Sequence, residues 1–115
     1  MTCNVTNNTK NEPQLQQARS LIEAGRLAEA LAICEGLVRK AGPSAHPHFM
    51  MALVHEARGD TTRAADHLRR AIYLDPDHKD ALLRLARLLG GPGDSEEARS
   101  LHERAQRIDE DRTPG

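Results

Sequence analysis

Aromatic side chains are almost absent from this sequence. Its 115 residues contain no Trp, one Tyr and one Phe, so aromatics make up 2% of the chain. A core built on aromatic packing is thereby excluded, and the apolar 38% must fill the core with Leu, Ala, Ile and Met. Such residues suit helices that pack closely through small side chains. The length fits one folded unit with short tails and excludes two globular domains.

Long apolar runs and an excess of one charge are also missing. No stretch approaches the roughly 20 apolar residues of a membrane span, and residues 1–10 lack the basic start and apolar stretch of a secretion signal. We therefore expect a cytoplasmic protein without membrane insertion. Lys and Arg number 16 against 17 Asp and Glu, so no surface biased toward nucleic acid is expected. The two cysteines, Cys3 and Cys34, fit reduced thiols.

The motifs of catalytic and cofactor sites are missing as well. We find no phosphate-binding glycine loop, nucleophile elbow, H-E-x-x-H helix or Cys/His pair. The glycine-rich stretch 90–93 lacks a following Lys and Ser or Thr, and we interpret it as a turn. The sequence therefore predicts a segment without enzymatic activity, catalytic residues or cofactors.

The 6 histidines raise the question of a metal site, because zinc takes three or four imidazole, thiolate or carboxylate ligands. His48 and His55 lie about two helical turns apart, too far to chelate one ion alone. No Cys or carboxylate is spaced to complete the set. We expect no metal and interpret these histidines as substitutes for aromatic residues in a half-buried contact, which protonation below about pH 6 would loosen.

An internal repeat with a period of 34 residues organises the chain. Two sets of small residues recur at this spacing, namely Gly25, Gly59 and Gly93, and then Ala30, Ala64 and Ala98. The repeats are residues 11–44, 45–78 and 79–112. Each breaks at its glycine between two apolar patterns of helical period, so six helices in antiparallel pairs are predicted.

The first helices are expected near 13–24, 46–58 and 79–90, and the second near 27–40, 61–74 and 95–108. Each glycine is expected to end a first helix in the left-handed conformation. Asp60 and Asp94 are expected as N-caps, and Glu97 completes a capping box with Asp94. The domain spans 12–109, between a disordered polar tail at 1–11 and a short tail at 110–115.

This pattern of large and small residues resembles the tetratricopeptide repeat. Residues 45–78 match best, through Met51, Ala52, Ala64, Leu68, Ala71 and Pro76, with His48 and His55 where Trp and Tyr are usual. The resemblance implies an all-α fold of three helix-turn-helix units stacked as a right-handed solenoid. It also implies a protein that binds another protein or domain.

A narrower resemblance is carried by AIYLDPDHKDAL at residues 71–82 and LARLL at 85–89. These runs look like the repeat segment appended to some CheR-type chemoreceptor methyltransferases of bacteria. In that family an S-adenosylmethionine-dependent domain, which methylates protein glutamates, precedes the repeats. The resemblance implies a non-catalytic accessory domain in chemotaxis signal transduction. The alternative is a free-standing adaptor or chaperone that binds a client segment.

Stacked helix pairs form a superhelix whose first helices line a concave groove. By register, the groove presents Leu15, Gln16, Arg19, Phe49, Met50, Leu53, Leu83, Arg84 and Arg87. We expect its apolar members on the middle repeat to hold an apolar side chain of the partner, and the three arginines to pair with its carboxylates. The alternative is that Phe49 and Leu53 belong to the core between repeats and the arginines are solvated.

Overall fold

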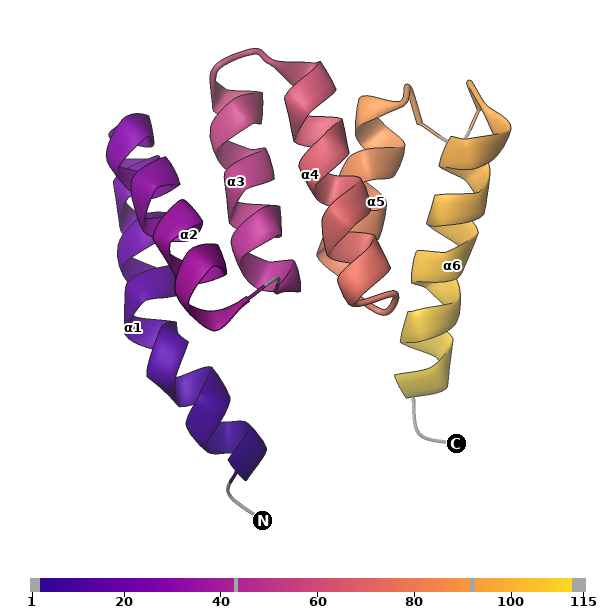
Figure 1. Ribbon diagram of the computed structural model, residues 1–115. Helices are drawn as coiled ribbons and strands as arrows, with labels where there is room; N and C mark the ends of the chain where they lie inside the picture. Colours follow the sequence, from indigo (N-terminus) through magenta and orange to yellow (C-terminus); the bar gives the residue numbers. More distant parts are fainter. Residues whose placement is uncertain (1–2, 43, 92, 113–115) are drawn as a thin grey trace.

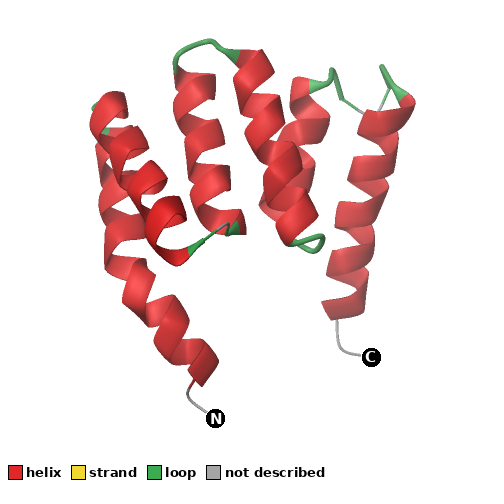
Figure 2. Ribbon diagram, viewed as in Figure 1, coloured by secondary structure: helices red, strands yellow, loops and turns green. Residues whose placement is uncertain are grey.

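All regular secondary structure of the described residues is helical, and short loops join the helices (Figures 1 and 2). The computed structural model describes the backbone of residues 3–42, 44–91 and 93–112, and the side chains of residues 13–40, 42, 44–91 and 93–110. The helices are α1 (Cys3–Glu23), α2 (Leu27–Ala41), α3 (Ala45–Ala57), α4 (Thr61–Leu74), α5 (Lys79–Leu88) and α6 (Glu96–Arg112). They pack in sequence order as pairs, which confirms the predicted fold.

The ends of the chain differ most from the predicted helix bounds. Helix α1 begins at Cys3 and carries Pro13 inside it, whereas the sequence predicted a start near residue 13 and a disordered tail before it. Extending an existing helix costs far less than nucleating one, so poor helix formers can continue it. Helix α6 likewise runs through residues 110–112 of the predicted tail. Residues 1–2 and 113–115 of the two predicted tails lie outside the described residues.

The turns within the first two repeats follow the prediction. Gly25 and Gly59 have φ angles of 81° and 80°, a left-handed conformation that suits a residue without Cβ. The Asp60 carboxylate then caps α4 by accepting a hydrogen bond of 3.1 Å from the Arg63 backbone N–H. The two turns therefore share a left-handed glycine, and they differ at the N-cap, where Arg26 before α2 makes no side-chain hydrogen bond.

The turn of the third repeat differs, and two predictions there are wrong. Helix α5 already ends at Leu88, and the left-handed residues are Gly90 and Gly91, with φ of 102° and 87°, in place of Gly93. The longer loop moves the N-cap by one residue, because Ser95 Oγ, and not Asp94, accepts the hydrogen bond from the Ala98 N–H at 3.0 Å. The predicted capping box is therefore not formed.

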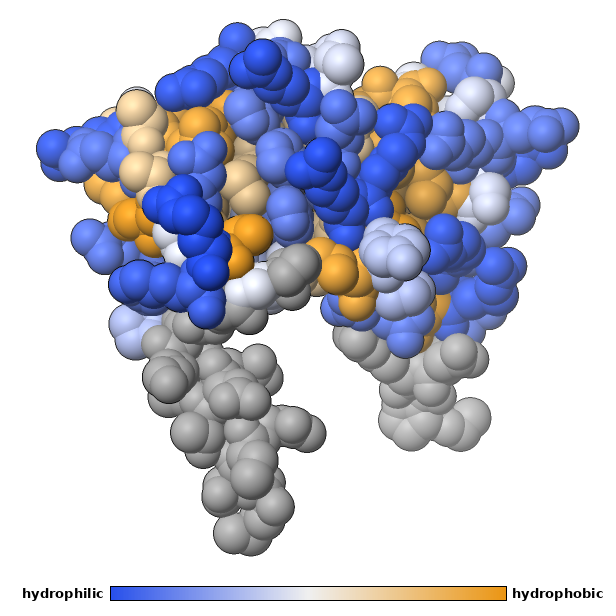
Figure 3. Space-filling model, viewed as in Figure 1, coloured by the Kyte–Doolittle hydropathy of each residue, from blue (hydrophilic) through white to orange (hydrophobic). Residues whose placement is uncertain are grey.

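The core follows the alanine spacing and is centred on α3. Ala30, Ala64 and Ala98 are each 0% exposed, so second helices approach first helices closely in all three repeats. Helix α3 packs against α1, α2 and α4, and most of its side chains are buried. Figure 3 shows one face of the surface, on which hydrophilic residues cover most of the area and apolar residues form patches among them. None of the described helices is both long and apolar enough to cross a membrane.

Polar contacts join the second repeat to the third, and the two partners of each contact are separated by the same number of residues in the sequence. Arg84 pairs with Glu56, Arg69 pairs with Glu97, and Arg104 donates to the Pro76 carbonyl oxygen, in each case across 28 residues. Among the described side chains, no salt bridge or side-chain hydrogen bond joins the first repeat to the second. That junction consists of apolar packing between α1, α2 and α3.

Candidate functional site

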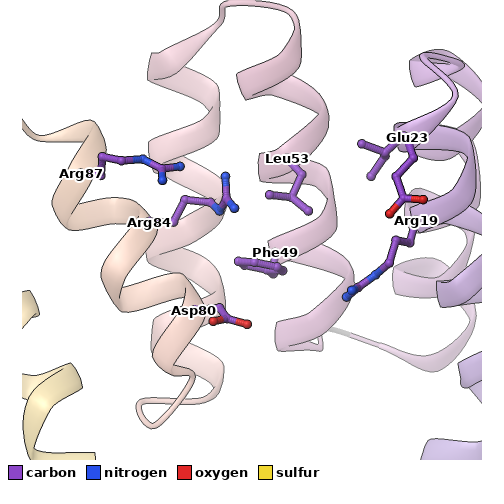
Figure 4. Close-up of a pocket in the computed structure, with 8 residues that line it drawn as sticks. Arg19, Glu23, Phe49, Leu53, Asp80, Arg84 and Arg87 are labelled. Atoms are coloured by element: carbon purple, nitrogen blue, oxygen red, sulfur yellow. The ribbon is translucent and has the colours of Figure 1, made fainter.

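The first helices of the three pairs line a hollow of about 330 Å³ (Figure 4). Its lining consists of Arg19, Ile22 and Glu23 from α1, Phe49 and Leu53 from α3, and Asp80, Arg84 and Arg87 from α5. In Figure 4 the apolar residues of α3 lie in the middle, with charged residues of α1 on one side and of α5 on the other. The hollow therefore has an apolar floor between two charged walls.

Five of the nine predicted groove residues line this hollow: Arg19, Phe49, Leu53, Arg84 and Arg87. Met50 does not, because it is 0% exposed in the core. One position along a helix turns a side chain by about 100°, enough to move Met50 from the groove to the interior. Leu15 and Leu83 pack against the core and Gln16 is exposed outside the hollow.

Three lining residues were missed by the sequence prediction, namely Ile22, Glu23 and Asp80. Glu23 follows Arg19 by four positions, and Asp80 precedes Arg84 by four. Residues at this spacing share a helix face. The four-residue spacing from the predicted arginines could therefore have placed Glu23 and Asp80 in the groove as well.

Phe49 combines the two roles that the sequence left open. Its side chain is only 5% exposed, and its ring lies 4.8 Å from the His78 ring and 6.0 Å from the His46 ring, between centroids. The Arg84 guanidinium lies 5.9 Å from the ring centroid, within the range of a cation–π contact. Phe49 is thus part of the core between repeats, and it also contributes to the floor of the hollow.

Glu56 of α3 holds one of the groove arginines. Arg84 Nη1 donates to Glu56 Oε1 at 2.6 Å, and Arg87 Nη2 lies 3.9 Å from Glu56 Oε2. The Glu56 side chain is 16% exposed, whereas that of Arg87 is 68% exposed. Arg19 is exposed and forms no salt bridge with the described side chains. Arg19 and Arg87 are therefore the cations of the hollow best placed to meet a ligand.

We expect Glu56→Gln to lower the free energy of unfolding by about 1 kcal/mol. The substitution removes the negative charge of a partly buried ion pair, although the amide oxygen can still accept a hydrogen bond from Arg84, and the partial exposure of Arg84 reduces the loss. Urea unfolding measures the effect. Glu23→Gln is the matched control, since Glu23 is exposed on the same hollow, and its effect should stay within about 0.5 kcal/mol. Equal effects of the two substitutions would contradict this role of Glu56.

The predicted contact formed by His48 and His55 is present and includes a third histidine. His48 and His55 are 8% and 6% exposed, and His67 of α4 lies against both. The His67 ring is nearly parallel to that of His55, with centroids 5.3 Å apart. Among the described residues, no group of three His, Cys, Asp or Glu side chains is placed to hold a metal ion.

The pKa values of His67 and Cys34 lie far from their usual ranges. Burial, together with the neighbouring His48, His55 and Arg70, lowers the pKa of His67 to about 4, against the opposing effect of Asp66. Burial also raises the pKa of the Cys34 thiol to about 11, with a further contribution from Glu35. A thiol with so high a pKa is a poor nucleophile, so Cys34 is a packing residue.

The sequence matches the tetratricopeptide repeat family over residues 56–114, and again over residues 12–35. The first match alone covers half of the chain. Together with three helix pairs at a fixed period, this match establishes that the chain belongs to the tetratricopeptide repeat family.

Two similar proteins are each described as a probable biofilm formation methyltransferase WspC. That of Pseudomonas putida (strain KT2440) is 39% identical over 87 residues, 76% of this chain and 20% of that protein. That of Pseudomonas aeruginosa (strain PAO1) is 38% identical over 94 residues, 82% of this chain and 22% of that protein. The chain thus spans about a fifth of the length of these relatives. The predicted resemblance to methyltransferase repeat segments is confirmed.

A solved structure supports the fold independently. The crystal structure of MamA protein superimposes with a TM-score of 0.71, covering 86% of this chain and 54% of that chain. The sequence identity is 21%, so the comparison concerns the fold alone.

Proposed function

We propose that this chain is a non-catalytic protein-binding domain of a CheR-type protein methyltransferase, and that its hollow holds a segment of another protein or domain. The observation that carries the proposal is the hollow itself, in which three successive repeats converge on an apolar floor with accessible cations beside it. Similarity to about a fifth of two methyltransferases supports the assignment to that class of parent protein.

The lining residues favour a partner segment of defined chemistry. An apolar side chain of the partner would cover Leu53, Ile22 and the exposed edge of Phe49. A carboxylate of the same segment would pair with Arg19 or Arg87, because Arg84 is already engaged by Glu56. Glu23 and Asp80 on the two walls would oppose a segment carrying many acidic residues. We therefore expect an amphipathic segment with few carboxylates.

Reversing the charge of Arg19 and Arg87, the two exposed cations of the hollow, tests this proposal. We expect the Arg19→Glu, Arg87→Glu variant to capture at least about tenfold less partner from bacterial extract than the unchanged protein, because two favourable pairs become repulsive. Quantitative mass spectrometry of the captured proteins measures the change. The Arg99→Glu, Arg107→Glu variant is the matched control, with the same change of net charge on exposed positions of α6.

Capture that survives in the Arg19, Arg87 variant would place the binding surface elsewhere. Captured proteins without any link to methylation or receptor signalling would favour the alternative of a free-standing adaptor.

A further inference from the structure

Three imidazoles meet between the two helices of the middle repeat. His48 and His55 come from α3 and His67 comes from α4. The His67 ring is stacked on both, at 5.4 Å from His48 and 5.3 Å from His55 between centroids. We call these three residues the imidazole stack. It lies in the contact between α3 and α4, and its two α3 members are among the buried polar residues of the protein.

The hydrogen bond within the imidazole stack requires that at least one of its two rings is neutral. His48 Nδ1 and His67 Nδ1 lie 3.1 Å apart, a hydrogen bond in which one nitrogen donates its proton and the other accepts with its lone pair. If both nitrogens carried protons, two N–H groups would point at each other. A protonated His67 would also lie against the buried His55 ring, in a partly buried place. The closed contact between α3 and α4 therefore tolerates few added protons.

The charged groups around the imidazole stack strengthen this preference. Arg70 of α4 acts on both His48 and His67 and disfavours their protonation, while Asp66 of the same helix favours that of His67. Burial is the largest cause for both rings, and their pKa values are lowered. An opened contact restores the ordinary pKa of about 6.5. The open form therefore binds more protons, and the closed form loses stability as pH falls from about 6.5 toward 4.

Helix α3 connects the imidazole stack to the hollow. His48 directly precedes Phe49 in the sequence, and Leu53 lies between His48 and His55 on the same helix. The floor of the hollow and the imidazole stack are thus two sides of one rigid element, so a shift of α3 relative to α4 moves both. We infer that the imidazole stack is a proton-sensitive contact, which weakens the packing of α3 against α4 as pH falls, so that this contact opens more often and the hollow is distorted when it does.

The test compares thermal unfolding at pH 7.5 and pH 5.0, above the range in which most carboxylates titrate. We expect the melting temperature of the unchanged protein to fall by roughly 4–8 °C over this interval. His67→Phe keeps a ring in the stack but cannot be protonated, and it should lose at least about half of this fall. His102→Phe on α6 is the control and should retain it. His46 and His78, which contact each other on the side of Phe49, stay unchanged in both variants.

Two further readouts keep the inference open to contradiction if a variant folds poorly. In the unchanged protein, imidazole NMR signals of His67 should remain those of a neutral ring down to about pH 5. Hydrogen exchange, corrected for the intrinsic effect of pH, should lose more protection in α3 and α4 than in α5 and α6 at acidic pH. Titration of His67 near its ordinary pKa, or the same pH dependence in His67→Phe and the unchanged protein, would overturn the proton-sensitive contact.

Discussion

Leu68→Ala is expected to lower the free energy of unfolding by about 2–5 kcal/mol. Leu68 is 0% exposed and is among the largest fully buried side chains of the molecule. Its removal loses the transfer free energy of the missing atoms and leaves a cavity in α4, which packs against α3 on one side and α5 on the other. A domain of this size has a stability of about 5–15 kcal/mol, so the substitution removes a large part of it.

Urea unfolding followed by circular dichroism measures this loss. Leu74→Ala is the matched control, because it makes the same chemical change at the end of the same helix, where the side chain is 39% exposed. We expect its effect to stay below about 1 kcal/mol. A loss at Leu68 no larger than that at Leu74 would contradict the burial of Leu68 between α4 and its neighbours α3 and α5.

Ala64→Leu tests the close approach of helices that the repeat imposes. Ala64 is 0% exposed, and its equivalents Ala30 and Ala98 are as completely buried, so none of the three repeats has room for a larger side chain there. We expect a loss of about 1–3 kcal/mol, because the added atoms must displace α4 from α3 or adopt strained rotamers. The resulting fall in melting temperature is measured by thermal unfolding.

Ala65→Leu provides the comparison for this substitution. Ala65 is the next residue of α4 and is only half-buried, so the same added atoms can extend toward solvent. Its melting temperature should remain close to that of the unchanged protein. If Ala64→Leu melts at the same temperature as well, the predicted register of the repeats would lose its physical basis.

The fold was predictable because the same pattern of glycine and alanine positions recurs in each repeat. The spacing of Gly25 and Gly59 located two tight turns, and the alanines five residues later located the helix contacts. The rule failed at Gly93, where two earlier glycines offer the left-handed conformation first and α5 therefore ends sooner. Local propensity also gave the wrong start for α1, because a packed helix can extend through residues that would not nucleate one.

The site was only partly predictable. Helix register indicates which side chains share a face of one helix, but it does not indicate which side chains of different helices make contact. Arg19, Arg84 and Arg87, which helix register assigned to one groove, line the same hollow. It could not reveal that Glu56 engages Arg84, because that contact joins two helices through the choice of side-chain rotamers. His67 was missed for the same reason, as nothing in the spacing along α4 indicates that it reaches His48 and His55.

The polar contacts described between the second and third repeats make the two junctions of the solenoid respond differently to ionic strength. The junction of the second and third repeats contains two ion pairs, Arg84 with Glu56 and Arg69 with Glu97. Their charges are partly exposed, so dissolved salt screens them. The junction of the first and second repeats consists of apolar packing, which strongly excluded salts such as sulfate reinforce. Added salt therefore weakens a polar contribution that only the junction toward the third repeat has among the described side chains, whereas sulfate reinforces the apolar packing.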